Sequence, residues 1–414
     1  MFVTIPKFDR PTVALIKKIL NEAKRKKISV YLVGGVVRDI ILKNKISDID
    51  FVLEADAIIF ATTLFKHSNV KLVVYPEFKT ATAVLKSGQR IDLSTARKEF
   101  YVKNGALPIV SQGCIKEDLF RRDFTINAMA LKCMNSDKAE LIDLFQGYED
   151  IQKENIRILH EKSFLDDPTR IFRAIRYEQR LGFNLERKTL NLLKSAVKRN
   201  VLNEISKERY FNELKKILCE VNVEDMITRL DHFGIFLYLD KEVKVNYKML
   251  HALQKNQGEF KDLKTPIWFI YFMSMLEGSG VKIIDRIIER FSFDKQQKKS
   301  LLQLSKVPII LKELQQGSKK FSDIFYLLND VTEEIIDYLW LRSSNKEVRK
   351  KLKQFLSDRQ VRLTIGGEDL KKLGVKSGRR MGDLMKLILL EKVNRGIKTR
   401  KEELELAKAL IESN

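Results

Sequence analysis

The first 145 residues alternate between short apolar runs and longer amphipathic segments. Apolar positions at helical spacing predict helices over 11–27 and 36–43, and a third helix that Asp56 caps. Short β-rich runs, separated by polar or glycine-bearing turns, predict strands over 28–33, 48–53, 71–75, 80–85 and 90–95. This alternation indicates a mixed domain of helices around a small β-sheet.

The pattern changes from about Leu144 onward, where apolar positions recur at every third or fourth residue. The clearest helical segments are 168–182, 186–197, 206–219, 223–233 and 282–291. Glycine and proline are scarce here, and no repeat of fixed period is visible. The predicted fold class is therefore α+β: a sheet-containing domain followed by an elongated all-α region. We predict domains at 1–145, 146–220, 221–340 and 341–414.

Charge narrows the range of partners. The chain has 414 residues, with 77 Lys and Arg against 55 Asp and Glu, a net charge of +22. Residues 1–150 carry a net +6 of this excess, and the remainder carries a net +16. Such an excess favours a polyanionic partner, nucleic acid first and an anionic membrane surface second.

Cysteine and apolar content exclude several classes of protein. Cys114, Cys133 and Cys219 are far apart and form no C-x-x-C pair, which argues against a disulfide scaffold and a cysteine-based zinc site. No apolar run reaches the ~18 residues of a membrane-spanning helix. The richest, 267–276, is typical of a buried helix, and the first ten residues lack the apolar stretch of a signal peptide. We expect a cytoplasmic protein without a membrane partner.

The most informative stretch is a glycine pair followed by two aspartates. A predicted strand runs into Gly34 and Gly35, and a helix begins at once, an arrangement that lets backbone N–H groups approach a phosphate. Asp48 and Asp50 lie two residues apart on the next predicted strand, so both carboxylates point to one face. Two carboxylates held that close favour a cation such as Mg²⁺ between them. Either feature alone is more often structural, but their order and spacing favour function.

This stretch resembles the nucleotidyltransferase superfamily of DNA polymerase β, and more closely the class II tRNA nucleotidyltransferases. That family includes CCA-adding and A-adding enzymes and bacterial poly(A) polymerases. The resemblance implies a nucleotidyltransferase head followed by a helical neck, body and tail. It also implies that Asp48 and Asp50 are the catalytic, metal-binding carboxylates, that Gly34 and Gly35 border the triphosphate, and that Arg38 supports it.

Asp92, on the predicted strand 90–95, is a possible third acidic group near the metals. An equally weighted alternative is a structural ion pair with Arg97 or Arg38.

A second block combines arginines with polar side chains. From composition alone it is the start of an amphipathic helix, although guanidinium groups suit phosphates, and Asp and Asn suit ribose hydroxyls. It matches the family's RRDFT-x-NA-x-A motif. The resemblance implies that the sugar and phosphates of a nucleotide are held by Asp118, Arg121, Arg122, Asp123 and Asn127.

A third block suggests how a base could be chosen without a template. Asp167 is the expected N-cap of a helix whose first turn contains Pro168, and Arg170 lies three residues further on. A carboxylate beside a guanidinium complements the amino group and ring nitrogen that cytosine and adenine share, and mismatches uracil and guanine. The alternative is a surface salt bridge between the two side chains.

The position of this third block is where the family carries its E-D-x-x-R motif. The chain departs from the motif at Asp166, which replaces Glu, whereas Asp167 and Arg170 match it. Arg173, one turn on, is expected to touch the base or the phosphates.

Weaker signals refine the hypothesis. The stretch 101–114 is typical of a loop beside the site, and 75–81 lacks the basic patch of poly(A) polymerases. Near the end, Lys376, Arg379 and Arg380 precede an apolar helix and are expected to bind RNA phosphates, unless they form only an interhelical turn.

These features together predict a tRNA nucleotidyltransferase that uses ATP, CTP and Mg²⁺ and grips the acceptor and TΨC arm of tRNA. It adds all of CCA, only the terminal A, or only CC. Two alternatives remain: a poly(A) polymerase and a non-catalytic RNA-binding protein.

Overall fold

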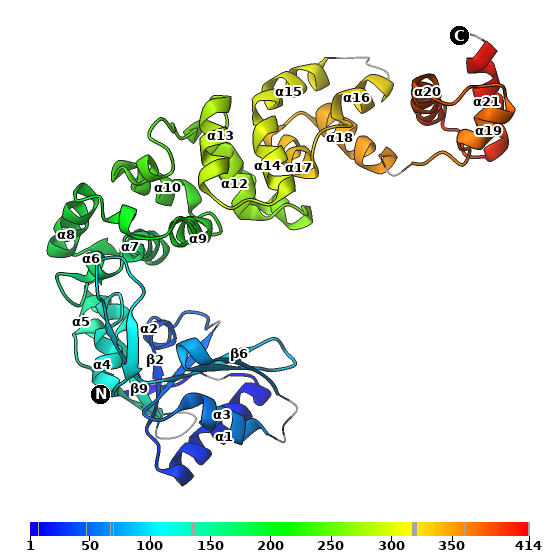
Figure 1. Cartoon of the computed structure of the whole chain (residues 1–414). Coiled ribbons are helices and arrows are strands. Elements are labelled where there is room, and N and C mark those ends of the chain that lie inside the picture. Colours follow the sequence, from blue (N-terminus) through cyan, green and yellow to red (C-terminus); the bar gives the residue numbers. More distant parts are fainter. Residues whose placement is uncertain are drawn as a thin grey trace. The chain divides into compact units, whose positions relative to one another are not determined.

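The computed structural model describes residues 1–6, 8–46, 48–66, 68, 70–133, 138–316, 321–359 and 361–412 (Figure 1). The chain divides into two compact units, Met1–Tyr238 and Leu239–Asn414. The fold class is α+β, as predicted, with the main sheet near the N-terminus and helices after it. The finer domain limits at 145, 220 and 340 stay predictions.

The first unit is built on a mixed sheet, which has eight strands within the described residues. In spatial order they are β1 (Phe2–Thr4), β10 (Lys138–Asp143), β9 (Met129–Cys133), β2 (Val30–Val33), β3 (Ile49–Leu53), β6 (Arg90–Thr95), β5 (Thr80–Val84) and β4 (Lys71–Tyr75). Strands β3 and β6 are parallel, and the other neighbouring pairs are antiparallel.

Helices cover one face of this sheet. Helix α1 (Arg10–Lys26) is capped by Asp9, and α3 (Ala57–Phe65) is capped by Asp56 as predicted. The two helices lie side by side below the sheet in Figure 1, and Lys18 of α1 lies 5.4 Å from the ring centre of Phe65. Thr95 of β6 accepts a hydrogen bond from the amide that starts α3. The opposite face of the sheet, towards which alternate residues of β3 and β6 point, is not covered by α1 or α3.

The pairing of β3 with β6 sets the positions of two carboxylates. In the parallel register Asp50 lies opposite Asp92, and Thr82 of β5 lies opposite Asp92 on the other side. In β6 the residues Ile91 and Leu93 are fully buried, whereas Asp92 between them is only partly buried. Because side chains alternate along a strand, Asp50 and Asp92 share the face away from α3.

Strand β3 begins at Ile49, one residue later than predicted. Asp48 is therefore an exposed residue just before the strand rather than a member of it.

The expected loop over 101–114 is partly wrong. Strand β8 (Ile109–Gln112) pairs with β7 (Arg97–Phe100) in a separate antiparallel hairpin, and only the connection between them is a loop. The four residues of β8 are mostly exposed, so they lack the alternation of buried positions that identifies a strand in a sequence.

The rest of the first unit is mainly helical. The two-residue strands β11 (Asn155–Ile156) and β12 (Asn184–Leu185) pair with each other, and short 3₁₀ turns include η1 (Pro76–Phe78), η2 (Thr125–Asn127), η3 (Val201–Glu204) and η4 (Ile235–Tyr238). The remaining helices are α2 (Gly35–Ile41), α4 (Ile115–Phe120), α5 (Gly147–Gln152), α6 (Ser163–Asp166), α7 (Thr169–Leu181), α8 (Arg187–Lys198), α9 (Lys207–Ile217) and α10 (Val223–His232).

The second unit consists of helices in its described residues. They are α11 (Tyr247–Lys255), η5 (Gln257–Asp262), α12 (Ile267–Leu276), α13 (Val281–Arg290), α14 (Lys295–Gln303), η6 (Leu304–Lys306), α15 (Val307–Gln315), α16 (Phe321–Leu328), α17 (Glu333–Arg342), α18 (Lys346–Asp358), α19 (Gly367–Lys372), α20 (Arg379–Arg395) and α21 (Arg400–Glu412). As the apolar run predicted, α12 is a core helix, with every residue from Phe269 onward buried. A buried ion pair between Lys392 and Glu403 joins α20 to α21.

Among the helices that the structure describes, none combines the length and apolar character that crossing a membrane requires.

Candidate functional site

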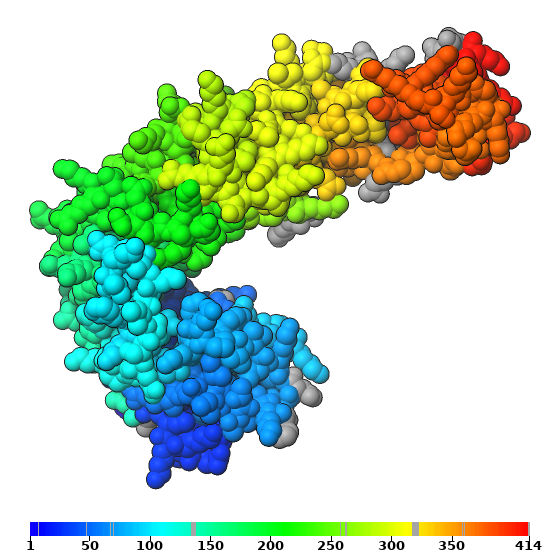
Figure 2. All heavy atoms as spheres, viewed as in Figure 1, coloured from blue at the N-terminus to red at the C-terminus, as the bar shows by residue number. Residues whose placement is uncertain are grey.

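A cavity of about 690 Å³ in the first unit gathers residues that are far apart in the sequence. The space-filling view shows the surface of this unit hollowed between the blue-to-cyan residues of the sheet region and the green helices (Figure 2). Most of the predicted site residues line the cavity: Gly34, Gly35, Asp50, Arg121, Arg122, Asp123, Asn127, Asp167, Arg170 and Arg173. The three sequence blocks therefore form one site.

We call Asp48, Asp50 and Asp92 the acidic cluster: Asp50 lines the cavity at its sheet side, and the charges of Asp92 and Asp48, which do not line it, act on Asp50. Burial, together with the charges of Asp92 and Asp48, raises the pKa of the Asp50 carboxyl to about 6, against the opposing charge of Arg122. Asp92 accepts a hydrogen bond of 2.5 Å from the hydroxyl of Thr82, which fixes its orientation.

The described ion pairs do not include one between Asp92 and Arg97 or Arg38, which was the alternative role for Asp92. The described ion pairs of its two suggested partners go elsewhere, since Arg38 pairs with Asp39 and Arg97 with Glu99.

The acidic cluster suits a divalent cation. Its donors are all carboxylate oxygens, the ligands that hard cations prefer. Burial is the largest cause of the raised pKa of Asp50, and the charges of Asp92 and Asp48 add a repulsion that a cation would relieve. Within the described ranges, no group of three or more His, Cys, Asp and Glu side chains is arranged to hold a metal ion. A cation at Asp48, Asp50 and Asp92 would therefore need further ligands from a bound phosphate or water.

Gly34 lies so close to Arg122 that a side chain at this position would displace the guanidinium group, whereas Gly35 has room for one. Gly34 has φ +78° and ψ −135°, a conformation that only glycine adopts readily. A Cβ atom at Gly34 would lie 2.6 Å from Nη1 of Arg122. Gly35 starts α2 and would place its Cβ 3.6 Å from Nη2 of Arg38, an ordinary contact.

We expect Gly34→Ala to lower stability by about 1–3 kcal/mol through backbone strain and to displace Arg122 from the cavity. Gly35→Ala is the matched control and should leave stability within about 0.5 kcal/mol. Urea unfolding of both variants measures the difference. Equal stability of the two variants would contradict this account of the turn.

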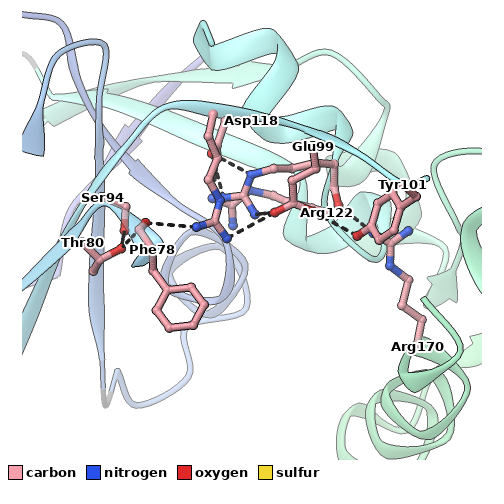
Figure 3. Close-up of polar contacts among 10 residues, drawn as sticks. Phe78, Thr80, Ser94, Glu99, Tyr101, Asp118, Arg122 and Arg170 are labelled. Carbon is pink, nitrogen blue, oxygen red and sulfur yellow. Dashed lines mark hydrogen bonds and ion pairs between the residues drawn. The ribbon is translucent and has the colours of Figure 1, made fainter. Parts of the chain in front are cut away.

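Asp118 orients two arginines from below the cavity. It is fully buried and does not line the cavity wall; its carboxylate accepts hydrogen bonds from Arg121 (2.7 Å) and Arg122 (2.8 Å). Burial alone would raise the pKa of Asp118, but the two guanidinium groups outweigh burial and hold it below its usual value. Arg121 also pairs with Glu99 at 3.1 Å. Figure 3 shows dashed contacts at both Asp118 and Glu99.

A second buried network joins the arginine block to α7 and α2. Asp123 accepts hydrogen bonds from Arg173 (2.6 Å) and from the amide of Asn127 (3.0 Å), and the Asn127 oxygen accepts one from Arg38 (2.7 Å). Arg38 is buried and lies behind Asn127 rather than on the cavity wall. Burial opposes ionisation of Asp123, but the charge of Arg173 and the Asn127 hydrogen bond lower its pKa to about 2.

This lowered pKa predicts how stability depends on pH. Ionised Asp123 stabilises the fold above its unfolded pKa of about 4, and this contribution is lost as the pH falls towards 2. We expect Asp123→Asn to be less stable than the unmodified chain at pH 7 by on the order of 2 kcal/mol, with the gap narrowing between pH 4 and pH 2.

Urea unfolding at a series of pH values measures this gap, with the exposed Asp225→Asn as control. A gap that does not change with pH would show that the Asp123 charge is not what stabilises the fold.

Asp167 was predicted to be the N-cap of α7, but the N-cap position falls one residue later, at Pro168, and Asp167 ends α6. Its backbone is extended (φ −134°, ψ 93°), and its carboxylate accepts hydrogen bonds from the amide and the hydroxyl of Thr169 at 3.0 and 2.6 Å. The same oxygen accepts a third bond from Arg209 at 2.8 Å.

Arg170 donates to the hydroxyl of Ser163 and to the backbone oxygen of Arg121, at 2.6 and 2.7 Å. The described contacts therefore do not include the surface salt bridge between Asp167 and Arg170 that was the alternative. Both side chains line the cavity.

Sequence reasoning missed several residues of the site. Arg209 starts α9 and links Asp167 to the backbone oxygen of Gly105, 2.7 Å away, in the loop of the hairpin. Glu99 and Tyr101 line the cavity from the hairpin itself. Tyr177 lies on α7 with the guanidinium of Arg38 5.1 Å from its ring centre. Arg209 belongs to the sequence Ser206–Tyr210 (SKERY), but its two contacts are with residues 42 and 104 positions away and are not visible in the sequence.

The predicted basic residues near the C-terminus lie in the second unit. Lys376, Arg379 and Arg380 line a different cavity of about 800 Å³ at the start of α20. All three are exposed.

Comparison with known families gives two matches. The poly A polymerase head domain matches residues 30–157, and the probable RNA- and SrmB-binding site of polymerase A matches residues 182–246.

The chain is 33% identical to the A-adding tRNA nucleotidyltransferase of Geobacter sulfurreducens over 98% of its own length and 48% of that protein. The chain thus spans about half the length of this relative. It is 30% identical to the CCA-adding enzyme of Bacillus cereus (strain ATCC 10987), over 68% of the chain and 72% of that protein. The Thermotoga maritima CCA-adding enzyme, solved in complex with tRNA, superposes with a TM-score of 0.73 at 31% identity, with 99% of each chain covered. Nucleotidyltransferases of this kind generally use divalent metal ions.

Proposed function

Because the chain belongs to the family of class II tRNA nucleotidyltransferases, we propose that it adds 3′-terminal CCA nucleotides to tRNA, from CTP and ATP, with release of pyrophosphate. One observation carries the proposal: Asp50, at the acidic cluster, and Asp167 with Arg170, the base-reading pair, line the same cavity. A single bound nucleoside triphosphate could then place its phosphates at the acidic cluster and its base at Asp167 and Arg170.

The reaction joins two substrates at the acidic cluster. The 3′-hydroxyl oxygen of the RNA attacks the α-phosphorus, a new P–O bond forms, and the bond from that phosphorus to the bridging oxygen of pyrophosphate breaks. The hydroxyl proton is lost, and Asp50 and Asp92 offer carboxylate oxygens that can accept it. Catalysis then depends on positioning and electrostatics, with no covalent intermediate on the protein.

Mg²⁺ is the cofactor that we propose for Asp48 and Asp50, because it is commonly held by one or two carboxylates together with substrate phosphates. When bound, Mg²⁺ supplies positive charge that offsets the triphosphate and favours ionisation of the attacking hydroxyl. Asp92, fixed by Thr82, is the third acidic group of this site.

Arg121 and Arg122 present guanidinium groups to the phosphates, and Asp118 below them fixes their direction. Asp123 and Asn127 are the polar groups available to the ribose hydroxyls. Arg38 and Arg173 hold these two residues, so their role is positioning behind the nucleotide. Gly34 adds no side chain of its own to the triphosphate side of the cavity, which leaves room for the guanidinium group of Arg122.

Base choice rests on Asp167 and Arg170. The carboxylate accepts from the exocyclic amino group of cytosine or adenine, and the guanidinium donates to the adjacent ring nitrogen. Uracil and guanine present a carbonyl and a ring N–H at these positions, which leaves buried groups unpaired. Each bidentate mismatch costs about 1–3 kcal/mol.

The proposed RNA partner is tRNA, held along its acceptor and TΨC arm by the helical part of the chain. The net charge of residues 151–414, +16, supports this, as do Lys376, Arg379 and Arg380 at the start of α20. None of the three cysteines forms a disulfide, which favours a reducing cytoplasm as the location.

Three tRNA substrates test the proposal: one that ends before CCA, one that ends after the first C, and one that ends after the second C. Each is incubated with CTP or ATP alone, and the products are sized. Addition of A to the third tRNA without addition of C to the first two identifies an A-adding enzyme. Addition of C to the first two tRNAs identifies CC addition, or complete CCA addition if A is also added to the third. Long A tails on an unstructured RNA would instead support a poly(A) polymerase.

A further inference from the structure

A smaller cavity of about 360 Å³ adjoins the candidate site on the outer strands of the sheet. The two cavities share Phe78, Arg97 and Arg121 in their walls. Asp50 lines the larger cavity, and Asp92, its neighbour in the β3–β6 register, lines the smaller one. Asp50 and Asp92 therefore lie on either side of the place where the two cavities meet.

Two exposed aromatic rings stand at the smaller cavity. Phe78 is 57% exposed and Tyr75 is 41% exposed, on the turn that connects β4 to β5. Large apolar rings that remain exposed beside charged groups are typical of a binding surface.

The backbone that carries Phe78 is fixed although its ring is exposed. Its carbonyl oxygen accepts hydrogen bonds from Nη1 of Arg97 and from the hydroxyl of Thr80, both at 3.1 Å. Lys79 has φ +50° and donates its amide to Pro76, which closes the turn. Figure 3 shows the ring of Phe78 pointing away from Thr80 and Ser94 into open space. The turn thus presents a rigid aromatic surface next to the acidic cluster.

Arginines supply positive charge around these rings. Arg90, at the start of β6, is exposed in the smaller cavity, and Arg97 and Arg121 form the shared wall. Aromatic rings interleaved with arginines are the usual surface for single-stranded RNA, because bases stack on the rings and phosphates pair with the guanidinium groups.

The reaction needs two substrates to reach the acids from different sides. The incoming nucleotide extends from the acids towards Asp167 and Arg170, which leaves the side of Asp92 for the RNA. We propose that the smaller cavity holds the single-stranded 3′ end of the RNA, with its terminal base stacked on Phe78, Tyr75 as a second stacking surface, and its phosphates at Arg90. This inference rests on the proposed function, since it assigns the site of the second substrate.

The test uses the full chain and a tRNA whose 3′-terminal base is 2-aminopurine, which loses fluorescence on stacking. We expect binding to quench this fluorescence and Phe78→Ala to remove most of the quenching. Phe78→Ala should also raise the KM for tRNA by about 5- to 100-fold, the range of one base–aromatic stack, and leave the KM for the nucleotide within about twofold. Tyr75→Ala should act in the same direction, and Phe78→Trp should retain the quenching.

Phe2→Ala is the matched control, since Phe2 is 70% exposed on β1 at the opposite edge of the same sheet. It should change neither the quenching nor either KM. The inference is overturned if Phe78→Ala raises the KM for the nucleotide but not for tRNA, or leaves the quenching intact while the chain adds nucleotides normally. If the quenching depends on Phe78 but the chain adds no nucleotide, the stacking site is supported and the proposed function is rejected.

Discussion

Replacing Asp50 with Asn should lower the rate of nucleotide addition by about 10³-fold, because it removes one of the charges on which the proposed metal site depends. The variant should still fold. Burial and the neighbouring carboxylates raise the pKa of Asp50 to about 6, so its ionised form costs stability above that pH in metal-free buffer, and Asn removes this cost. Single-turnover addition to tRNA measures the rate, and thermal unfolding checks the fold.

Glu140→Gln is the matched control for Asp50→Asn. Glu140 is an exposed strand carboxylate on β10 of the same sheet, and its replacement should leave the rate within about twofold. Replacing both Asp48 and Asp50 with Ala separates the proposed enzyme from an RNA-binding protein. If the double variant performed as well as the unmodified chain, the acidic cluster would have no catalytic role.

The second large effect concerns the choice of base. Asp167→Asn should reduce the preference for ATP and CTP over UTP and GTP by about 10- to 100-fold, the size of one lost base contact. The amide oxygen of Asn can still accept the hydrogen bonds from Thr169, so the start of α7 should stay intact, while the amide nitrogen can now donate to the carbonyl that uracil presents. Rates with the four nucleotides, each supplied alone, give the preference.

Glu186→Gln is the control for Asp167→Asn, since Glu186 caps α8 in the same unit through two backbone amides. It should leave the preference unchanged. If Asp167→Asn lowered all four rates equally, Asp167 would act only on the fold of α7 and not on the base.

The local pattern of apolar, polar and capping residues predicted most helices and strands, because each of them depends mainly on its own residues. The helices α1 and α3 have side-chain caps at Asp9 and Asp56, and α12 is a continuous apolar run that is buried from Phe269 onward. Strand β8 was missed because its exposed residues carry no alternation.

The sequence predicted the site residues that lie together in one motif. It did not predict the positions of residues that only the fold brings together. Asp92 could be named from the sequence only as one of two alternatives, because the parallel β3–β6 pairing that places it opposite Asp50 is not specified by the sequence. Arg209 and Phe78 reach the site through contacts with distant segments, Asp167 and Arg97. The sequence also did not show that Asp118 and Arg38 lie behind the cavity wall, although both belong to the motifs predicted to bind the nucleotide.

The most direct test of the account sequences the 3′ ends of a pool of tRNAs that end before CCA, after the first C and after the second C. The pool is incubated with all four nucleotides and Mg²⁺. The account predicts that only C and A are added, that each A follows two Cs, and that no addition continues beyond the complete CCA end. Addition of U or G at comparable frequency, or of A tails that continue beyond that end, would contradict it.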